Sequence, residues 1–318
     1  MKHDMMWAYL IHLSMNMWGD SLGVKPHPQH YNSLSEYLDE DTWKKTIDFL
    51  PSQGINTVLI DVGDALQYET HPEISIPGAW SKDKLKAELD RIRSLGLTPY
   101  PKLNFSTGHD AWLGIYSYMV STPQYYQVCK DVIGEVAEVF DYPALFHLGM
   151  DEENQTMQKR NEYCVIRQGD LWWHDSYFLY DCCEKLGMRP WVWADMVWER
   201  REEYISRMPK SVLQSNWYYY QLFADKNPDG SYVCPYYEAY RVLDKAGFDQ
   251  VLTGSTVSYR DNLELTMRIA KNDIAPEHLK GVMTTPWMAT VELNQYDLFS
   301  DARHFRDGKE KVFPEYCK

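Results

Sequence analysis

The stretch SKDKLKAELDRIRSLGLTPYPKLN, residues 81–104, contains the pattern that determines the fold of this chain. Residues 81–96 alternate apolar and charged side chains in the manner of an amphipathic helix. Gly96 stands where a glycine commonly ends a helix, and residues 97–104 follow as a short strand-like run. A helix that returns directly into a strand is one unit of an α/β fold.

The same alternation continues in both directions from this stretch. Eight strand candidates are present, at residues 6–14, 55–62, 97–104, 144–150, 189–195, 211–219, 250–257 and 281–287. Helix candidates between them include residues 41–54, 81–96, 122–140, 170–187 and 237–247. Two further helices are expected to end in glycine, at Gly187 and Gly247.

Eight strands and seven or eight helices in strict order predict an α/β fold, a single (β/α)8 TIM barrel over residues 1–318. Length alone also fits two domains, but no linker or charge run interrupts the order. A doubly wound open sheet is the structural alternative, although no GxGxxG follows the first strand. Residues 292–305 are expected to close the ring as a helix, with a polar C-terminal tail from about 303 to 318.

Charge and composition exclude several classes of partner. The chain has 32 Lys and Arg against 46 Asp and Glu, a net charge of −14, which argues against nucleic acid and anionic membranes as partners. No apolar run is long enough to span a bilayer, and the first residues lack the plan of a signal peptide. An exported protein without its leader would begin in the same way, so the compartment stays open.

The cysteines and aromatic residues add two expectations. The six cysteines show no CxxC pair or metal-finger spacing and are expected to be mostly free thiols. The 12 Trp and 24 Tyr far outnumber the 10 Phe, and such amphipathic rings can line a wet cleft.

Polar and aromatic residues gather where the predicted strands end, which is the face on which barrel enzymes build their sites. The candidates are His12, Asn16, Trp18, Asp61, Asp64, Asn104, His109, His147, Asp151, Glu152, Glu153, Trp193, Asp195, Asn216, Trp217, Tyr218, Ser255, Tyr259, Trp287 and Glu292. Any one of them could be a capping or loop residue, so the functional interpretation depends on the set.

Three successive carboxylates in FHLGMDEEN, residues 146–154, are the sharpest of these features. Crowded carboxylates raise the pKa of one of their number, which suits a general acid beside an ionised neighbour. The alternative is an acidic first turn of the next helix, where the helix dipole favours negative charge. The neighbouring histidines could also be metal ligands, but the HxH of metal-dependent amidohydrolase barrels is absent after the first strand.

Residues 147–152, HLGMDE, resemble the H-x-G-x-D-E motif of family 20 glycoside hydrolases, the β-N-acetylhexosaminidases. Residues 96–109 resemble the family's G-[IL]-x-x-x-P-E-I-D-x-P-G-H stretch, residues 193–196 its W-D-D-M, and Trp287 falls where its last-strand tryptophan lies. The resemblance covers most of the chain, motif by motif.

The resemblance implies a mechanism in which the substrate's own 2-acetamido oxygen is the nucleophile. Asp151 would then orient the acetamido group and stabilise the oxazolinium, and Glu152 would protonate the leaving oxygen and later activate water. His109 would lie behind Glu152 and tune its proton affinity together with Asp61 or Asp64.

The resemblance also implies the substrate-binding residues. Trp193, Trp217 and Trp287 would wall the acetamido pocket, and Tyr218 or Tyr259 would supply a hydroxyl to the acetamido group. The remaining expected contacts to the sugar are His12, Asn16, Trp18, Asp61, Asn104, His147 and Asp195.

The chain departs from the family pattern at several places. The family's arginine near the end of the first strand has no counterpart, and His12, Asn16 and Trp18 stand there instead. Lys102 and Asn104 replace the family's Glu and Asp, and the small domain that usually precedes the barrel is not seen. These features predict a divergent, barrel-only relative.

The sequence therefore predicts a glycosidase of β-N-acetylhexosaminidase type that acts on 2-acetamido sugar glycans without a metal or organic cofactor. The alternatives are a metal-dependent isomerase or hydrolase barrel, and a carbohydrate-binding barrel that has lost turnover.

Overall fold

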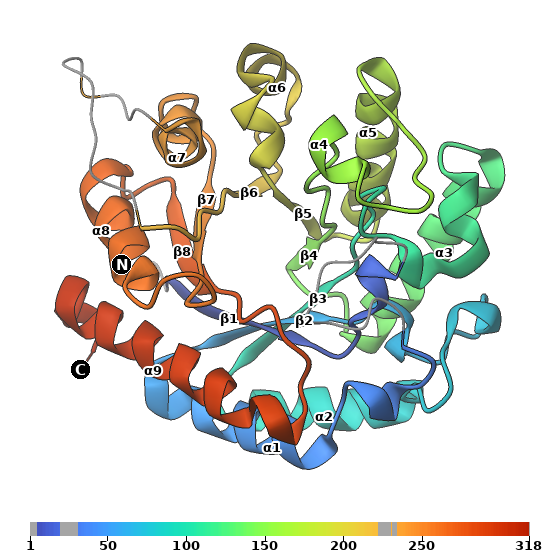
Figure 1. Cartoon of the computed structure of the whole chain (residues 1–318), viewed down its shortest axis with the longest axis horizontal. Coiled ribbons are helices and arrows are strands. Elements are labelled where there is room, and N and C mark those ends of the chain that lie inside the picture. The colour runs from blue at the N-terminus through green and yellow to red at the C-terminus, as the bar shows by residue number, and fades with distance from the viewer. Residues whose placement is uncertain (1–4, 20–30, 222–229, 231–233, 318) are drawn as a thin grey trace.

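The strands form a closed barrel in which β1 to β8 follow one another in chain order and every pair is parallel (Figure 1). The computed structural model describes residues 5–19, 31–221, 230 and 234–317. The strands are β1 Met6–His12, β2 Thr57–Asp61, β3 Thr98–Lys102, β4 Leu145–His147, β5 Arg189–Trp193, β6 Leu213–Ser215, β7 Gln250–Gly254 and β8 Leu279–Thr284. The predicted (β/α)8 barrel is confirmed.

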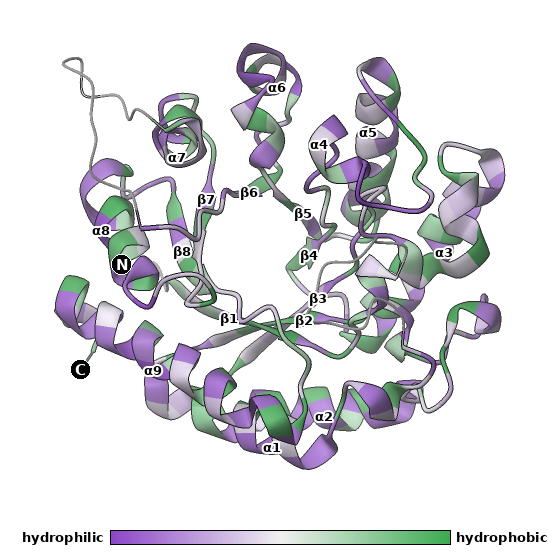
Figure 2. Ribbon diagram, in the orientation of Figure 1, coloured by the Kyte–Doolittle hydropathy of each residue, from purple (hydrophilic) through white to green (hydrophobic). Residues whose placement is uncertain are grey.

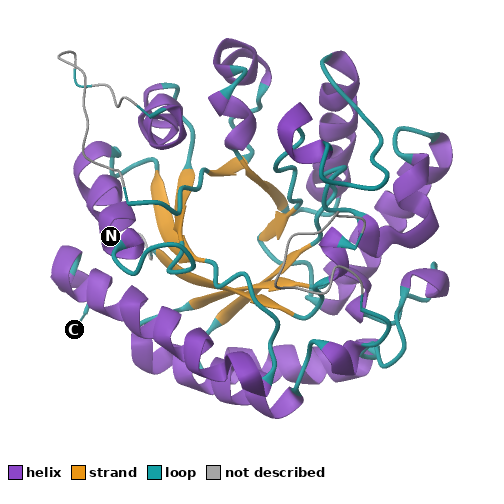
Figure 3. Ribbon diagram, in the orientation of Figure 1, coloured by secondary structure: helices purple, strands orange, loops and turns teal. Residues whose placement is uncertain are grey.

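The helices surround this ring of strands, as Figure 3 shows. They are α1 Glu40–Phe49, α2 Lys82–Ser94, α3 Pro123–Val139, α4 Gln155–Gln158, α5 Asp170–Lys185, α6 Arg201–Arg207, α7 Pro235–Lys245, α8 Asn262–Asp273 and α9 Gln295–Val312. α1, α2 and α3 begin at side chains that accept a hydrogen bond from the first turn: Asp39, Ser81 and Thr122.

Three of the glycines expected to follow helices do so in the left-handed backbone region. Gly96, Gly187 and Gly247 have φ values of 80°, 78° and 78°, a conformation that costs glycine little. Their N–H groups donate to carbonyls of the last helical turns. The expected ends of α2, α5 and α7 are confirmed.

The polar tail expected from about residue 303 is wrong for most of its length. α9 continues to Val312 and buries Phe305, Gly308 and Lys309, with Phe305 and Lys309 beside Trp7 of β1 and Gly308 beside Met267 of α8. The exposed charges of this helix include Arg303, Asp307, Glu310 and Lys311, and few apolar residues stand between them, which is why the sequence resembles a polar tail. A short 3-10 helix, Pro314–Tyr316, follows it.

Apolar side chains form two layers, one between the strands and the helices and one inside the barrel. The inner layer consists of Ala8, Leu10, Leu59, Leu145, Trp191, Trp193, Leu213, Val251 and Met283. Figure 2 shows hydrophobic and hydrophilic residues alternating along the outer helices, as expected for elements with one face on the core.

Above the inner layer, four polar residues share one level of the barrel. The strand register aligns His12 with Asp61, Asp61 with Lys102, and Lys102 with His147. All four are buried, and since side chains alternate along a strand they point inward, as Leu10 and Leu59 do two residues earlier. This polar row forms the level directly beneath the carboxyl-terminal face.

Two further expectations can be compared with the described part of the chain. All six cysteines lie in it and are free thiols, as expected. No helix among the described residues is long and apolar enough to cross a membrane.

Candidate active site

The backbone turns sharply where β4 ends, and this turn presents the acidic residues. Gly149, Met150 and Glu152 have φ values of 73°, 74° and 59°. A Cβ on Gly149 would lie 2.0 Å from Oδ1 of Asn104, so only glycine fits there. The left-handed backbone conformations of Met150 and Glu152 each cost about 1–3 kcal/mol, so contacts with the surrounding structure must stabilise this turn.

His109 lies between the two carboxylates that follow β4. Its Nδ1 is 3.2 Å from Oδ1 of Asp151, and its Nε2 is 3.3 Å from Oε2 of Glu152. Asn104 donates from Nδ2 to the same Asp151 oxygen at 2.9 Å, and the Ser106 hydroxyl donates to the Asp151 carbonyl. Loops after two neighbouring strands, β3 and β4, are thereby joined through polar contacts.

These contacts set the charges of the central pair. Burial alone would lower the pKa of His109, but the charges and hydrogen bonds of Asp151 and Glu152 outweigh it and raise that pKa to about 10. Burial alone would raise the pKa of Asp151, but His109, Lys102 and Asn104 lower it to about 2. Near neutral pH the site therefore holds an imidazolium against an ionised Asp151.

This charge state predicts a pH dependence of stability. The pKa of His109 is raised from its ordinary value of 6.5 to about 10, so its contribution is complete below pH 6.5 and is lost as pH rises through about 10. We expect the free energy of unfolding to fall more steeply over this window in the wild type than in His109→Gln. Urea denaturation at several pH values measures both slopes, and parallel curves would contradict a charged His109.

Asp195, which follows β5, lies against the same turn. Its Oδ2 accepts the Glu152 N–H at 2.8 Å, while its buried Oδ1 has no partner among the described residues. Burial and the negative charge of Asp151 raise the pKa of Asp195 well above its usual range. The carboxyl with the raised pKa is thus that of Asp195, in the segment after β5. Within residues 151–153, where crowding was expected to raise a pKa, the pKa of Asp151 is lowered.

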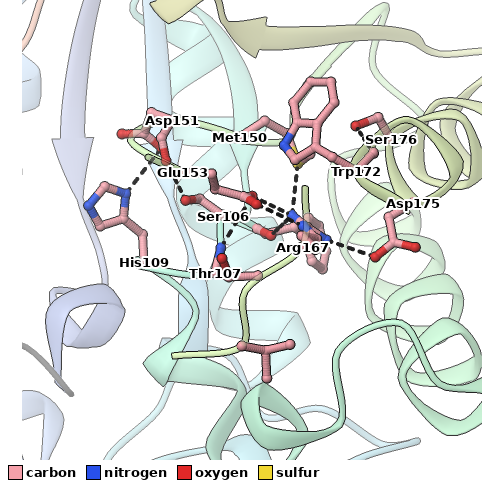
Figure 4. Close-up of polar contacts among 12 residues, drawn as sticks. Ser106, Thr107, His109, Met150, Asp151, Glu153, Arg167, Trp172, Asp175 and Ser176 are labelled. Atoms are coloured by element: carbon pink, nitrogen blue, oxygen red, sulfur yellow. Dashed lines mark hydrogen bonds and ion pairs between the residues drawn. The ribbon is translucent and has the colours of Figure 1, made fainter. Parts of the chain in front are cut away.

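Glu153, the third acid of the run, points away from Asp151 and into a buried ion cluster (Figure 4). Arg167 binds both of its oxygens, from Nε at 2.9 Å and from Nη2 at 2.6 Å. Nη1 of the same guanidinium lies 3.2 Å from Asp175 of α5, and Nη2 also donates to the Phe105 carbonyl. Glu153 and Arg167 therefore join the loops after β3 and β4 through buried polar contacts.

The acidic run does not form the first turn of the next helix. α4 begins after Asn154, whose side chain accepts from the N–H groups of Thr156 and Met157. The dipole interpretation of the acidic run is therefore wrong.

The expected pairing of His109 with Asp61 is also wrong. Asp61 is bound by the Lys102 ammonium, and its Oδ2 lies 3.6 Å from His12 Nδ1. Burial raises the pKa of Asp61, but the Lys102 charge and the His12 hydrogen bond lower it, with a net decrease. Burial lowers the pKa of both His12 and His147. The polar row thus has one ion pair between two neutral histidines.

Asn16 and Asp64 serve the loop after β1. The Asn16 amide donates to Asp64 at 2.7 Å and to the Tyr31 carbonyl at 3.0 Å, and its oxygen accepts the Tyr31 N–H at 2.8 Å. Asp64 also accepts from the Ser14 hydroxyl at 2.7 Å. These bonds occupy the Asn16 amide, so the structure does not place it with the carboxylate pair.

Aromatic rings adjoin the carboxylate pair on one side. The Trp18 ring lies 6.1 Å from His109 and 5.9 Å from Trp287, and Trp287 lies 6.0 Å from Trp193. His147 packs against Trp193 at 4.5 Å. The structure thus brings Trp18, Trp193 and Trp287 together as one aromatic wall.

A tyrosine that the sequence reasoning missed extends this wall. Tyr219 stacks on Trp217 at 5.1 Å, and its hydroxyl accepts from Thr285 at 3.3 Å. Burial raises the pKa of Tyr219, with smaller contributions from Asp151 and Glu152. Side-chain alternation after β6 puts residues 217 and 219 on one face, and this period-two pattern was the available signal.

The two tyrosines that were expected here lie elsewhere. Tyr218 packs against Tyr237 of α7 at 5.0 Å, and Tyr259 is exposed beside Tyr220. Tyr218 is one residue out of phase with the site.

No cluster of three or more His, Cys, Asp or Glu side chains suited to a metal ion occurs in the described ranges.

Comparison with known proteins finds similarity only among solved structures. No protein-family model and no curated protein matches the sequence. Among solved structures, the β-N-acetylhexosaminidase from Bacteroides fragilis NCTC 9343 has 14% identity and a TM-score of 0.61, over 89% of this chain and 60% of that one. The GH20 β-N-acetylhexosaminidase from Streptomyces coelicolor A3(2) has 13% identity and a TM-score of 0.62, over 95% and 64%.

A third neighbour is the GH20 exo β-N-acetylglucosaminidase from Vibrio harveyi, solved with N-acetylglucosamine, at 13% identity and a TM-score of 0.58 over 88% of this chain and 55% of that one. The chain thus spans less than two thirds of the length of these three proteins. The expected resemblance is confirmed at the level of the fold: the chain has the barrel fold of family 20 β-N-acetylhexosaminidases.

Proposed function

We propose that this protein is a glycoside hydrolase that removes 2-acetamido sugars with retention of configuration, using the acetamido oxygen of the substrate as nucleophile. The observation that carries the proposal is the contact of His109 with both Asp151 and Glu152 at the mouth of this barrel. Two carboxylates of different exposure, with one histidine between them, suit one charged and one proton-transferring role.

Asp151 is the residue that would act on the acetamido group. It is buried, and the lowering of its pKa to about 2 keeps it ionised over the working range. A fixed carboxylate can accept the acetamido N–H, orient the carbonyl oxygen toward the sugar's reacting carbon, and stabilise the positive charge of the oxazolinium. Asn104 and His109 hold it in one orientation.

Glu152 is the residue that would transfer protons. It is partly exposed, and its Oε2 lies by His109, while its Oε1 has no hydrogen-bond partner among the described residues. Asp195 fixes the Glu152 backbone from the other side. Glu152 would donate a proton to the leaving oxygen and then, as a base, activate the water that opens the oxazolinium.

The aromatic wall supports a carbohydrate ligand. The partly exposed rings of Trp287 and of the neighbouring Trp217 are surfaces of the kind that pack on sugar rings and on an acetamido methyl group, and the buried Trp193 packs behind Trp287. In place of Tyr218 or Tyr259, we propose that the Tyr219 hydroxyl binds the acetamido group. This hydroxyl accepts a hydrogen bond from Thr285, and the charges of Asp151 and Glu152 contribute to the rise in its pKa. The Vibrio neighbour's complex with N-acetylglucosamine supports the same class of ligand.

A panel of nitrophenyl β-glycosides with and without a 2-acetamido group tests the proposal. We expect release of nitrophenol only from the 2-acetamido members, because the other sugars lack the nucleophile. Equal turnover of plain glycosides would point to an enzyme nucleophile and contradict the mechanism. Binding of N-acetylglucosamine without turnover of any member would support the non-catalytic barrel instead.

A further inference from the structure

Lys102 lies in the buried polar row beneath the carboxyl-terminal face, and none of the catalytic roles proposed above uses it. It ends β3, its side chain is fully buried, and its ammonium binds Oδ2 of Asp61 on β2. A charge at this depth is screened little by water, so it acts strongly on the groups around it. Lys102 can therefore influence the reacting centre without touching it.

The groups beside Lys102 on the neighbouring strands show where its charge is directed. Oδ2 of Asp61 also lies 3.6 Å from Nδ1 of His12 on β1, so His12 faces the negative member of the pair. On the other side, the strand register places Lys102 opposite His147 of β4. The positive member of the pair therefore lies next to the strand that leads into Asp151.

The two histidines of the polar row do not share this positive charge. Nδ1 of His147 accepts the Gly149 N–H at 3.0 Å, so this nitrogen carries no proton and the ring is neutral. Burial lowers the pKa of His147 well below its usual range, and the charge of Lys102 lowers it further. Burial also lowers the pKa of His12. Lys102 is therefore the cation of the polar row.

Lys102 is linked to Asp151 through the end of β3 and the loop that follows it. Residues 102 and 104 project to the same side of an extended chain, and Asn104 donates from Nδ2 to Oδ1 of Asp151 at 2.9 Å. Burial raises the pKa of Asp151, but His109 and then Lys102 lower it to about 2. Two cations, one beside Asp151 and one in the row beneath, thus favour its ionised form.

The other titratable groups about Asp151 do not replace Lys102. They are His109 after β3, Glu152 next in the chain, Asp195 after β5 and Tyr219 after β6. Burial raises the pKa of Asp195 and of Tyr219, which favours their neutral forms. His109 is shared with Glu152, which changes its charge during the proposed reaction. Lys102 is paired with Asp61 instead, so proton transfer at Glu152 leaves this pair in place.

We propose that Lys102 is a positioning residue that keeps Asp151 negatively charged for its contact with the acetamido group. The role of Asp151 in this statement rests on the proposed function, whereas the coupling between the two charges does not. Lys102 acts through Asp151, so its removal should change the pH at which Asp151 takes up a proton.

Carbon NMR of protein with isotopically labelled aspartate carboxyls measures this effect directly. The signal of Asp151 is identified by its absence in Asp151→Asn. Asp61→Asn/Lys102→Met removes both members of the buried pair, which is less damaging than removal of one. We expect the midpoint of the Asp151 titration to rise by about one pH unit in this variant, because a nearby cation lowers the pKa of a carboxyl.

Two controls separate the charge of Lys102 from its packing. Asp61→Asn alone keeps the ammonium and should leave the midpoint of Asp151 at the wild-type value or below it. Lys309 of α9 is a second buried lysine, and its Nζ donates to the Gly54 carbonyl at 2.7 Å, before β2 begins. Lys309→Met should leave the midpoint unchanged, because this ammonium lies at the opposite end of the strands.

The pH dependence of kcat/KM for a nitrophenyl 2-acetamido glycoside gives the functional readout. Asp151 must be ionised to act, so activity is lost as the pH falls through its pKa. The acid limb of the profile should therefore move upward by about one pH unit in Asp61→Asn/Lys102→Met, as the NMR midpoint does.

An unchanged midpoint in the double variant, or an equal rise in Asp61→Asn, would overturn the assignment of this charge effect to Lys102. A raised midpoint with an unshifted acid limb would overturn its part in turnover. If the wild type hydrolyses no 2-acetamido glycoside, the proposed function fails, and the NMR midpoints alone still decide whether Lys102 sets the charge of Asp151.

Discussion

Glu152→Gln should lower kcat/KM for an oligosaccharide of 2-acetamido sugars by about 10³-fold, within the range typical of a lost general acid. Glutamine keeps the shape of the side chain and its position near His109, but its amide has no acidic proton to give to the leaving oxygen. Nitrophenolate leaves with little protonation, so the loss on a nitrophenyl glycoside should be clearly smaller. Steady-state kinetics on the two substrates give this ratio directly.

Asp151→Asn should lower both values by a similar large factor, because Asp151 acts on the acetamido group and not on the leaving oxygen. The neutral amide cannot offset the positive charge that develops on the oxazolinium. Glu162→Gln, an exposed acid in the same segment, is the control and should leave both substrates unaffected. A Glu152→Gln loss that is equal on both substrates would remove the general-acid assignment, and near-normal turnover by Asp151→Asn would remove substrate assistance.

Much of this geometry follows from sequence because of how a parallel barrel closes. Every strand ends on the same face, so a residue soon after β3, such as His109, and one soon after β4, such as Asp151, can be expected to meet. The same logic holds for His12 and Asp61, which the register aligns. The alternation of apolar runs with amphipathic stretches predicts all eight strands, although most strands are shorter in the structure than the apolar runs.

The errors have physical causes that a single sequence does not display. Successive side chains after a strand point to opposite sides, so an error of one residue moves a side chain out of the site. Tyr219 stacks on Trp217, whereas Tyr218 packs against Tyr237 of α7. The role of Glu153 depends on Arg167, which lies in an irregular segment without periodicity. Lys102 was noted only as a departure, yet its charge partner Asp61 is 41 residues away, a distance that local patterns do not cover.

Arg167→Met should lower the free energy of unfolding by about 3–5 kcal/mol, the largest stability change we expect from one substitution in this chain. The guanidinium is fully buried, and its removal leaves Glu153 and Asp175 as buried carboxylates without their cation. It also releases the Phe105 carbonyl, and thus the bond between the loops after β3 and β4. Urea denaturation followed by tryptophan fluorescence measures the change.

Two further variants separate the cost of unpaired charge from the cost of a lost side chain. Arg268→Met breaks an exposed pair with Glu264 on α8 and should cost less than about 1 kcal/mol. Adding Glu153→Gln to Arg167→Met should restore part of the stability, because one of the two unpaired charges is removed. If Arg167→Met is no less stable than Arg268→Met, the cluster does not hold the strained turn at Met150 and Glu152, and the bonds from Asp195 and Ser106 must suffice to keep the carboxylates in place.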